Sequence, residues 1–430
     1  MKFCLPLVAL CTVSFTFAVP TAPSNPIAQR DLPLVQSNQL RQVLLRSELL
    51  KKAKILEDFA YSTPQRNRLI GTPGHNATVN WITDTIAQFP NYYTYYLEPF
   101  DLSLGVSANL TNNGSSMEVF AVGLSPAGHV SGPLVYVPNL GCETGGISMA
   151  DGEALVARVQ AGETVIADLA TEMAVSTTYN VIAETIGGDH ENVIHMSGHS
   201  DSVAAGPGIN DNGSGTISLL EITIQLTNFS VTNAVRFSWW SGEEEGLLGA
   251  TYYVSQQPQS ELDKIRLMLD FDMMASPNYA YQIYDGDGSA FGESGPPGSG
   301  EAEHEFERYF AQDAGLNFTS IAFDGRSDYG PFLAAGVATG GIACGAEGIK
   351  TVEEAAMFGG QAGVAYDACY HSACDDYGNL DVGAWMQMTK AIAHMTATFA
   401  RSFGSSFLPG VKQWKSSEWR SRDSSLVTRL

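Results

Sequence analysis

The stretch AVRFSWWSGEEEGLLGA (residues 234–250) contains a strand pattern, a turn and the start of a helix. Residues 234–241 are mostly apolar and rich in aromatic side chains, as is typical of a buried strand. Glycines then flank three consecutive glutamates, Glu243 to Glu245, and a helical pattern begins near Leu247. A buried strand followed by a turn and a helix predicts one unit of an α/β fold.

Similar units lie on both sides of this stretch. Strands are expected at 179–188, 191–201, 264–274 and 337–345, and helices at 215–228 and 301–315. Apolar strands that alternate with amphipathic helices indicate a mostly parallel, doubly wound central sheet flanked by helices. In such a sheet, ligands bind beyond the carboxyl ends of the strands, so polar residues there are candidates for a site.

The composition limits the classes of partner. Hydrophobic residues make up 44% of the 430 residues, which is enough for a large core. The net charge of −23 argues against nucleic acid and anionic membranes as partners. The same charge would attract divalent cations wherever carboxylates converge.

Residues 1–18 have the pattern of a secretory signal peptide: a lysine, an apolar run from Phe3 to Phe17 and a small residue, Ala18. A membrane anchor is less favoured, because the run is short and Pro6 interrupts it. We expect a secreted, extracellular protein, with the vacuole as an alternative destination, and no membrane contact after cleavage. A glycoprotein is also expected, because sequons occur at Asn76, Asn109, Asn113, Asn212, Asn228 and Asn317.

Residues able to bind metals or move protons follow the predicted strands. They are His199, Asp201, Asp211, Glu243, Glu244, Asp270 and Asp272, with Tyr370 and His371 downstream in AYDACYHSACDD. Singly, each has an ordinary structural explanation; an aspartate before a helix, for example, is most often an N-cap. Together, at one edge of one sheet, their carboxylates and imidazoles predict a metal site.

The motifs that carry these residues resemble those of one enzyme family. GHSDSV, AGPGINDNGSGT, SGEEEGLLGA, DFDMMASPNY, SDYGPFLAAGV and CYHSACD span residues 198–376, and IGTPGHNATVN (70–80) extends the likeness. They resemble the metallo-aminopeptidases with two co-catalytic zinc ions, such as bacterial secreted zinc aminopeptidases and fungal aminopeptidase Y. The resemblance implies a zinc-peptidase (phosphorylase/hydrolase-like) α/β fold and hydrolysis of the N-terminal bond of peptides that have a free N-terminus.

The resemblance also implies two Zn²⁺ per chain and a role for each matching residue. His199 and Glu244 are expected to bind one zinc, Asp272 and His371 the other, and Asp211 is expected to bridge them. A bridge is needed because paired catalytic metals lie only about 3.5–4 Å apart. Asp201, two positions after His199, matches the carboxylate that orients this ligand.

The resemblance implies catalytic roles for two further residues. Glu243 matches the general base that takes a proton from the attacking water, and Tyr370 matches the residue that supports the oxyanion. A disulfide between Cys369 and Cys374 would hold the segment that contains Tyr370. Glu245 matches no ligand and is expected to be a polar residue near the start of the next helix.

The chain differs from aminopeptidase Y relatives in one region. These relatives have a protease-associated insert before the metal motifs, and here only its edges are recognisable, so the insert is expected to be truncated. We favour Cys142 and Cys344 as unpaired, and a disulfide between them is the alternative. The predicted division is a signal peptide (1–18), a pro-segment or N-terminal extension (19–50), the zinc peptidase domain (51–115 and 178–403), the remnant of the insert (116–177) and a C-terminal tail (404–430). A monomer is expected.

Two other functions stay open. Glutaminyl cyclases are acyltransferases that share this fold and similar ligands but use one zinc, and a non-catalytic relative is the third alternative. The GEEEGLLGA and CYHSACD stretches resemble peptidases, and every ligand, base and oxyanion position is filled. The sequon at Asn212 directly follows Asp211, so we expect it to be unused, because a glycan there would block the site.

Overall fold

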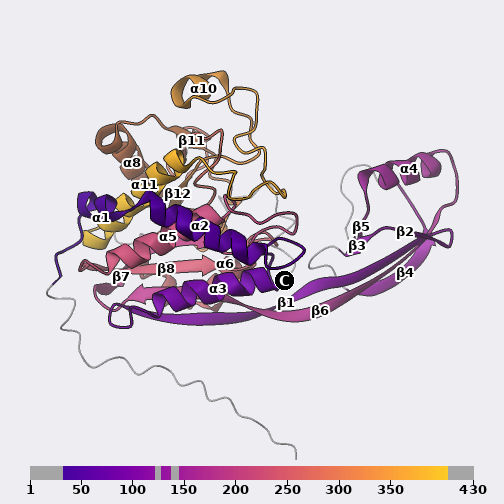
Figure 1. The fold of residues 1–430 in the computed structure, drawn as a ribbon, viewed down its shortest axis with the longest axis horizontal. Helices are drawn as coiled ribbons and strands as arrows, with labels where there is room; N and C mark the ends of the chain where they lie inside the picture. The colour runs from indigo at the N-terminus through magenta and orange to yellow at the C-terminus, as the bar shows by residue number, and fades with distance from the viewer. Residues whose placement is uncertain (1–31, 122–126, 137–144, 405–430) are drawn as a thin grey trace, which may run out of the picture.

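The computed structural model describes residues 32–121, 127–136 and 145–404 (Figure 1). The predicted signal peptide, Cys142 and nearly all of the predicted C-terminal tail lie outside the described residues. Among the residues that are described, no helix is long and apolar enough to cross a membrane.

Four parallel strands form the centre of the molecule. They are β8 (Asn233–Trp240), β7 (Asp189–His199), β9 (Ile265–Phe271) and β12 (Thr339–Ala343), hydrogen-bonded in that order. Beyond β8 the sheet continues through antiparallel β6 (Ile166–Thr185) and β1 (Tyr93–Asn112), and beyond β12 through antiparallel β10 (Gln282–Tyr284) and then β11 (Thr319–Ile321). Apart from the first four residues of β7, the central strands are almost fully buried, which explains their continuous apolar runs.

Helices cover both faces of this sheet, and the predicted α/β class is confirmed. The larger core lies under α1 (Ser37–Val43), α2 (Arg46–Ala60), α3 (Pro73–Ile86), α5 (Gly213–Leu226), α8 (Ser299–Arg308), η1 (Tyr309–Ala314) and α11 (Val382–Arg401). The smaller core lies under α6 (Leu248–Gln256), α7 (Gln259–Leu262) and α9 (Tyr329–Ala334). Leu267 and Leu269 of β9 belong to the larger core and Met268 to the smaller, as alternation along a strand requires.

The described part of the predicted N-terminal extension packs into the larger core. Leu40 and Leu49 are fully buried there, and Arg401 donates a hydrogen bond to the carbonyl of Val35. Just beyond the predicted boundary, the Lys52 ammonium is 2.7 Å from a carboxylate oxygen of Glu221 in α5. These contacts join residues 35–52 to the body of the molecule.

Two long strands leave this body as a ribbon. β1 and β6 pair along almost their whole length and lead to a lobe built from β2 (Ser115–Met117), β3 (Phe120–Ala121), β4 (Gly128–Pro133), β5 (Gly145–Gly146) and α4 (Met149–Gln160) (Figure 1). At the root of the ribbon, Phe100 packs with Ile70 and stacks on Tyr252 at a ring distance of 5.3 Å. The lobe contains most of residues 116–177, and its origin as a protease-associated insert stays a prediction.

Candidate functional site

Three neighbouring strands end at the site. β7 ends at His199, β9 ends one residue before Asp272, and the turn after β8 holds Glu243 and Glu244. Because β8, β7 and β9 are adjacent and parallel, their carboxyl ends lie at one edge of the sheet. Strand pairing therefore brings these residues together, as the sequence predicted.

Asp211 reaches the same edge from the start of α5. A cis peptide bond joins Asp211 to Asn212, and Asn212 is the N-cap residue of α5. The Asn212 side chain accepts a hydrogen bond from Gly215 N and donates one to the Phe271 carbonyl at 2.8 Å. Since Asn212 is fully buried, a glycan has no room there in the folded protein, which agrees with the expectation that this sequon is unused.

Four predicted ligands converge around the fifth, Asp211. Its two carboxylate oxygens lie 3.3 Å from His199 Nε2 and 3.2 Å from His371 Nε2. Asp272 Oδ1 is 3.4 Å from His199 Nε2, and Glu244 Oε2 is 2.9 Å from His371 Nε2. Asp211 thus lies between two histidine–carboxylate pairs.

The closest contacts differ from the predicted pairing of the ligands, and which ligands share a zinc ion stays a prediction. Glu244 was expected beside His199, and Asp272 beside His371, but the closest contacts have the opposite partners. Asp272 follows β9, and β9 is hydrogen-bonded to β7, the strand that ends at His199. His199, Asp211 and Glu244 also each bring an atom within 4.8 Å of one another, so the two pairs form one compact cluster.

Asp201 supports this cluster from behind. It is fully buried, and its Oδ1 lies 3.6 Å from His199 Nδ1. The same carboxylate accepts hydrogen bonds from the backbone N–H groups of Glu243, at 3.3 Å, and Glu244, at 3.4 Å. Burial alone would raise the pKa of Asp201, but the nearby imidazoles of His199 and His75 together outweigh burial and lower it.

The cluster fits metal ions. Both ring nitrogens of His199, Oε1 of Glu244 and Oδ1 of Asp272 are buried and form no hydrogen bond. Burial and the nearby Asp211 raise the pKa of Glu244 to about 7, which reflects how poorly the protein alone stabilises several neighbouring carboxylates. Nitrogen and oxygen donors without partners are the set that zinc accepts.

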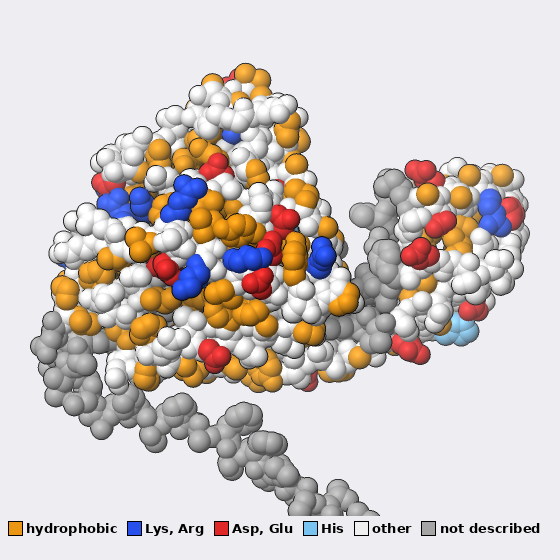
Figure 2. Space-filling model, viewed as in Figure 1, with side chains coloured by type: hydrophobic (Ala, Val, Ile, Leu, Met, Phe, Trp, Pro, Cys, Tyr) orange, Lys and Arg blue, Asp and Glu red, His pale blue; other side chains and the backbone are white. Residues whose placement is uncertain are grey.

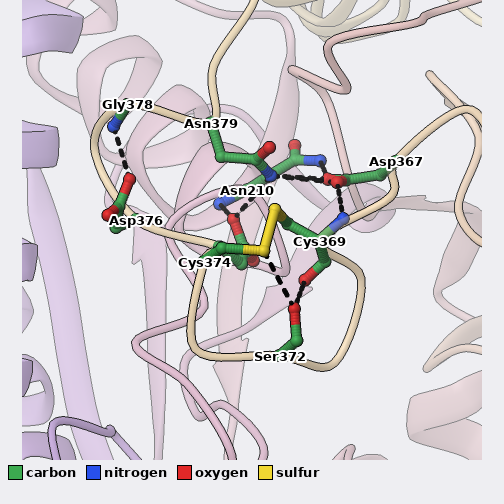
Figure 3. Close-up of a disulfide and its surroundings, with 9 residues drawn as sticks. Asn210, Asp367, Cys369, Ser372, Cys374, Asp376, Gly378 and Asn379 are labelled. Atoms are coloured by element: carbon green, nitrogen blue, oxygen red, sulfur yellow. Dashed lines mark hydrogen bonds between the residues drawn. A yellow bond between two sulfur atoms is a disulfide. The ribbon is translucent and has the colours of Figure 1, made fainter.

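The predicted disulfide between Cys369 and Cys374 is present, with the sulfur atoms 2.04 Å apart (Figure 3). Cys344 is buried and forms no disulfide with another described cysteine, and its thiol donates to the carbonyl of Met274. Cys142, also expected to be unpaired, lies outside the described residues.

Buried polar side chains tie the disulfide loop to the Asp211 segment (Figure 3). Asp367 accepts hydrogen bonds from Cys369 N at 2.8 Å and from Asn210 Nδ2 at 2.7 Å. Asp375, after the loop, accepts from the backbone N–H groups of Asn210, at 2.8 Å, and Asp211, at 2.9 Å. The loop that contains His371 and the turn that contains Asp211 are therefore held in one hydrogen-bonded unit.

A cleft of about 310 Å³ opens from the cluster. Its polar end is lined by Asp211, Glu243, Asp272, Tyr370 and His371. Its other end extends over β12, β10 and β11 and is lined by Met273, Gln282, Tyr284, Ile321, Ala343 and Tyr366. The cleft therefore joins a carboxylate-rich end to an end with mostly apolar or aromatic side chains, which we call the apolar end. Asp324, Arg326 and Glu347 also line the cleft.

Sequence reasoning missed the buried guanidinium of Arg68. Its nitrogens donate to the backbone carbonyls of Ser200, Pro207 and Gly208, in the loop between His199 and Asp211. Burial lowers the pKa of Arg68 to about 10, and the group stays a cation near the cluster. Arg68 lies two residues before the motif IGTPGHNATVN (70–80), but its partners are backbone carbonyls, which cannot be recognised in a sequence.

Two supporting residues lie inside motifs whose roles were not assigned. Ser327, in SDYGPFLAAGV, donates a hydrogen bond to Asp272 Oδ2 at 3.0 Å. Asp375, the last residue of CYHSACD, is the acceptor described above. Their positions inside the motifs were the sequence feature that could have identified them as supporting residues.

Comparisons with known proteins agree with this site. The profile of Peptidase family M28 matches residues 180–396. Leucine aminopeptidase 2 of Arthroderma otae is 40% identical, over 86% of this chain and 87% of the relative. Probable leucine aminopeptidase 2 of Aspergillus fumigatus is 42% identical, over 87% of each chain.

Solved structures share the fold. An aminopeptidase from Aneurinibacillus sp. strain AM-1 aligns with a TM-score of 0.64 and 19% identity, over 85% of this chain and 97% of that chain. A zinc aminopeptidase from Bacillus subtilis aligns with a TM-score of 0.63 and 19% identity, over 86% and 97%. These likenesses confirm the resemblance seen in the motifs, and the chain belongs to peptidase family M28.

Proposed function

We propose that the protein is a secreted zinc aminopeptidase that releases the N-terminal residue of peptides. The observation that carries this proposal is the convergence of two histidines and three carboxylates at the polar end of a cleft. The names of the relatives in Arthroderma otae and Aspergillus fumigatus support an aminopeptidase, and the Bacillus subtilis structure supports zinc.

Two zinc ions would be held by the five ligands. His199 and Asp272 would bind one, Glu244 and His371 the other, and Asp211 would contribute one oxygen to each. Zinc bound there acts as a Lewis acid toward water and toward the scissile carbonyl.

Glu243 is proposed to move the proton. It lines the cleft, and its Oε2 lies 3.8 Å from His199 Nε2. Burial, together with the charges of Asp272 and Glu244, raises the pKa of Glu243 well above its ordinary value, although His199 opposes this effect. A carboxylate with a raised pKa takes a proton from the attacking water and returns it to the leaving amine.

Tyr370 is proposed to support the oxyanion. Its ring stacks on that of His371 at a centroid distance of 3.7 Å, which holds the phenol at the cleft. Burial, with the charges of Asp211 and Asp272, raises the pKa of Tyr370, so its hydroxyl stays protonated and can donate a hydrogen bond.

The substrate's free α-amine would lie near Glu243 and Asp272, both acceptors at the polar end. Its side chain would then extend toward Met273 and Ile321 at the apolar end. This direction favours an apolar N-terminal residue, in agreement with the word leucine in the relatives' names. The protein is proposed to act as a monomer outside the cell.

Glu243→Gln tests the mechanism. The variant should stay folded and bind two zinc ions, measured by elemental analysis, while turnover of Leu-p-nitroanilide falls by about 10³-fold or more. Glu244→Gln should instead lose zinc. A Glu243→Gln enzyme that keeps most of its turnover would refute the proposed role of this residue.

A glutaminyl cyclase is the weaker alternative. Glutaminyl cyclase of Porphyromonas gingivalis shares the fold, with a TM-score of 0.50 and 13% identity over 83% of this chain and 97% of that chain. Incubating the enzyme with a peptide that begins with glutamine separates the two reactions. Release of free glutamine supports the aminopeptidase, and cyclisation with loss of ammonia supports the alternative.

A further inference from the structure

Residues 349–365 leave the sheet after β12 and return at the wall of the cleft. This excursion contains α10 (Val352–Phe358), which stands away from the sheet at the top of Figure 1. A bridge between Ile349 and Ala365 closes its base, where Lys350 N donates to the carbonyl of Val364. None of the predicted site residues lies within the excursion, so the mechanism gives it no role.

Tyr366 follows the excursion directly and lines the apolar end of the cleft. Its backbone is fixed on both sides, because Tyr366 N donates to Gly348 O and its carbonyl accepts from Asn278 N, both at 2.9 Å. The ring lies against Gly345 and Gly348, where a Cβ atom would collide with it or press closely on it. The ring thus packs directly on backbone and is only 7% exposed.

The hydroxyl of Tyr366 is held from the excursion. It donates to Oε2 of Glu354, in α10, at 2.6 Å. The same oxygen accepts from the backbone N–H of Thr351 at 2.8 Å and from its hydroxyl at 3.0 Å, in the capping box of α10. Glu354 therefore joins the end of a helix outside the sheet to a residue in the wall of the cleft.

We infer that Glu354 is a positioning residue: by holding Tyr366 it fixes the shape of the pocket for the N-terminal side chain, and so sets the enzyme's selectivity. This inference rests on the proposed function. A wall held at its base and its tip excludes side chains larger than the pocket, whereas a phenol held only at its base can tilt to admit them. Leucine should therefore be favoured over phenylalanine while the hydrogen bond is intact.

Other contacts keep the excursion in place without this hydrogen bond. Lys350 Nζ donates to the carbonyl of Tyr279 at 2.6 Å. The Asn278 side chain donates to the carbonyl of Gln361 at 3.0 Å and accepts from its N–H at 2.9 Å. Removing the Tyr366 hydroxyl therefore leaves the anchors of the excursion intact and should act on the wall of the pocket.

Kinetics of the full-length, zinc-loaded enzyme on Leu- and Phe-p-nitroanilide test the inference. Tyr366→Phe and Glu354→Ala should each lower the ratio of the two kcat/KM values by about fivefold, as expected for one lost hydrogen bond. The change should come from KM for the phenylalanine substrate. Glu354→Gln keeps an acceptor and should restore most of the ratio.

Two further variants separate positioning from general structure. Glu353→Ala changes the neighbouring, exposed glutamate of α10 and should keep the wild-type ratio. The double variant Tyr366→Phe/Glu354→Ala should be no less selective than either single variant, because both remove the same bond. If Tyr366→Phe is active and keeps the wild-type ratio of kcat/KM values, the inference is wrong. This test holds even if Glu354→Ala does not fold. A wild-type enzyme inactive on all aminoacyl anilides would overturn the proposed function instead.

Discussion

The site edge of the sheet and the lobe at the end of the ribbon use polar and apolar groups in opposite ways. At the site, charged groups such as Asp201 and Asp375 are buried and hydrogen-bonded. In the lobe and ribbon, apolar side chains such as Val130 and Val175 are 63% and 71% exposed. Figure 2 shows acidic side chains spread over the lobe, with basic ones mostly on the body. We therefore expect activity to depend on the buried network of the body.

Asp211→Asn is the strongest test of this contrast. Because Asp211 contacts both histidines, its loss should weaken zinc binding at both positions and lower kcat/KM by at least about 10³-fold. Elemental analysis and Leu-p-nitroanilide turnover measure the two effects. Asp168→Asn, on the exposed surface of the ribbon, is the control, and equal losses in both variants would remove the distinction between the regions.

Asp375→Asn examines the layer behind the ligands. Replacing one carboxylate oxygen by an amide removes an acceptor for the N–H of Asn210 or Asp211, so zinc affinity should fall by about 10–100-fold. Competition with a chelator measures this change. Asp376→Asn is a matched control, because the Asp376 carboxylate accepts a hydrogen bond from Gly378 N and not from the Asp211 segment. Unchanged affinity in Asp375→Asn would mean that the ligands hold their positions without this support.

The root of the ribbon should contribute more to stability than its exposed surface. Phe100→Ala removes a ring that is 6% exposed and packed on Tyr252, and should lower the free energy of unfolding by about 3 kcal/mol. Val175→Ser, at an exposed position, should change it by less than about 0.5 kcal/mol. Denaturant unfolding compares the two, and similar values would mean that the ribbon is not anchored at Phe100.

The pH dependence of stability should also differ between the regions. Burial would raise the pKa of Glu305, but hydrogen bonds from Arg308 and His394 lower it from 4.5 to about 2. A lowered carboxyl pKa contributes stability that is complete above pH 4.5 and lost as the pH falls toward 2. The free energy of unfolding of the wild type should therefore exceed that of Glu305→Gln by about 2 kcal/mol at pH 6, after allowance for partial exposure. Near pH 2 the two values should be almost equal.

The ion pair of the lobe is the control for this pH experiment. Glu163 pairs with Arg158 on the exposed surface, where the solvent screens the interaction. Glu163→Gln should leave the unfolding midpoint of the protein unchanged across the same pH range. A pH-dependent difference as large as that of Glu305→Gln would show that exposure does not separate the two regions.

The sequence predicted the centre of the sheet and the set of residues at its edge because both depend on local patterns. Apolar runs predicted β7, β8 and β9, and the motifs placed His199 and Asp272 at or just after strand ends. The closest contacts between the ligands differ from the predicted pairing, because they depend on which strands are neighbours. Arg68 was missed because a buried guanidinium bound to carbonyls leaves no periodic pattern.

The long ribbon was also not predicted. Pairing along most of β1 and β6 joins segments about 70 residues apart along the chain. Such pairing is nonlocal, and neither strand reveals its partner by itself. The residues of the site were thus easier to predict from the sequence than the pairing of the two ribbon strands.

The ribbon also makes the lobe a replaceable module. Both chain crossings between lobe and body run through one antiparallel pair, in which Asp101 faces Thr177 and accepts a hydrogen bond from its hydroxyl at 2.6 Å. A short hairpin turn joining the two strands beyond this pair would close the chain without moving a ligand. We therefore expect insertions and deletions beyond that point to leave the active site in place, so that the length of this region can change independently of catalysis.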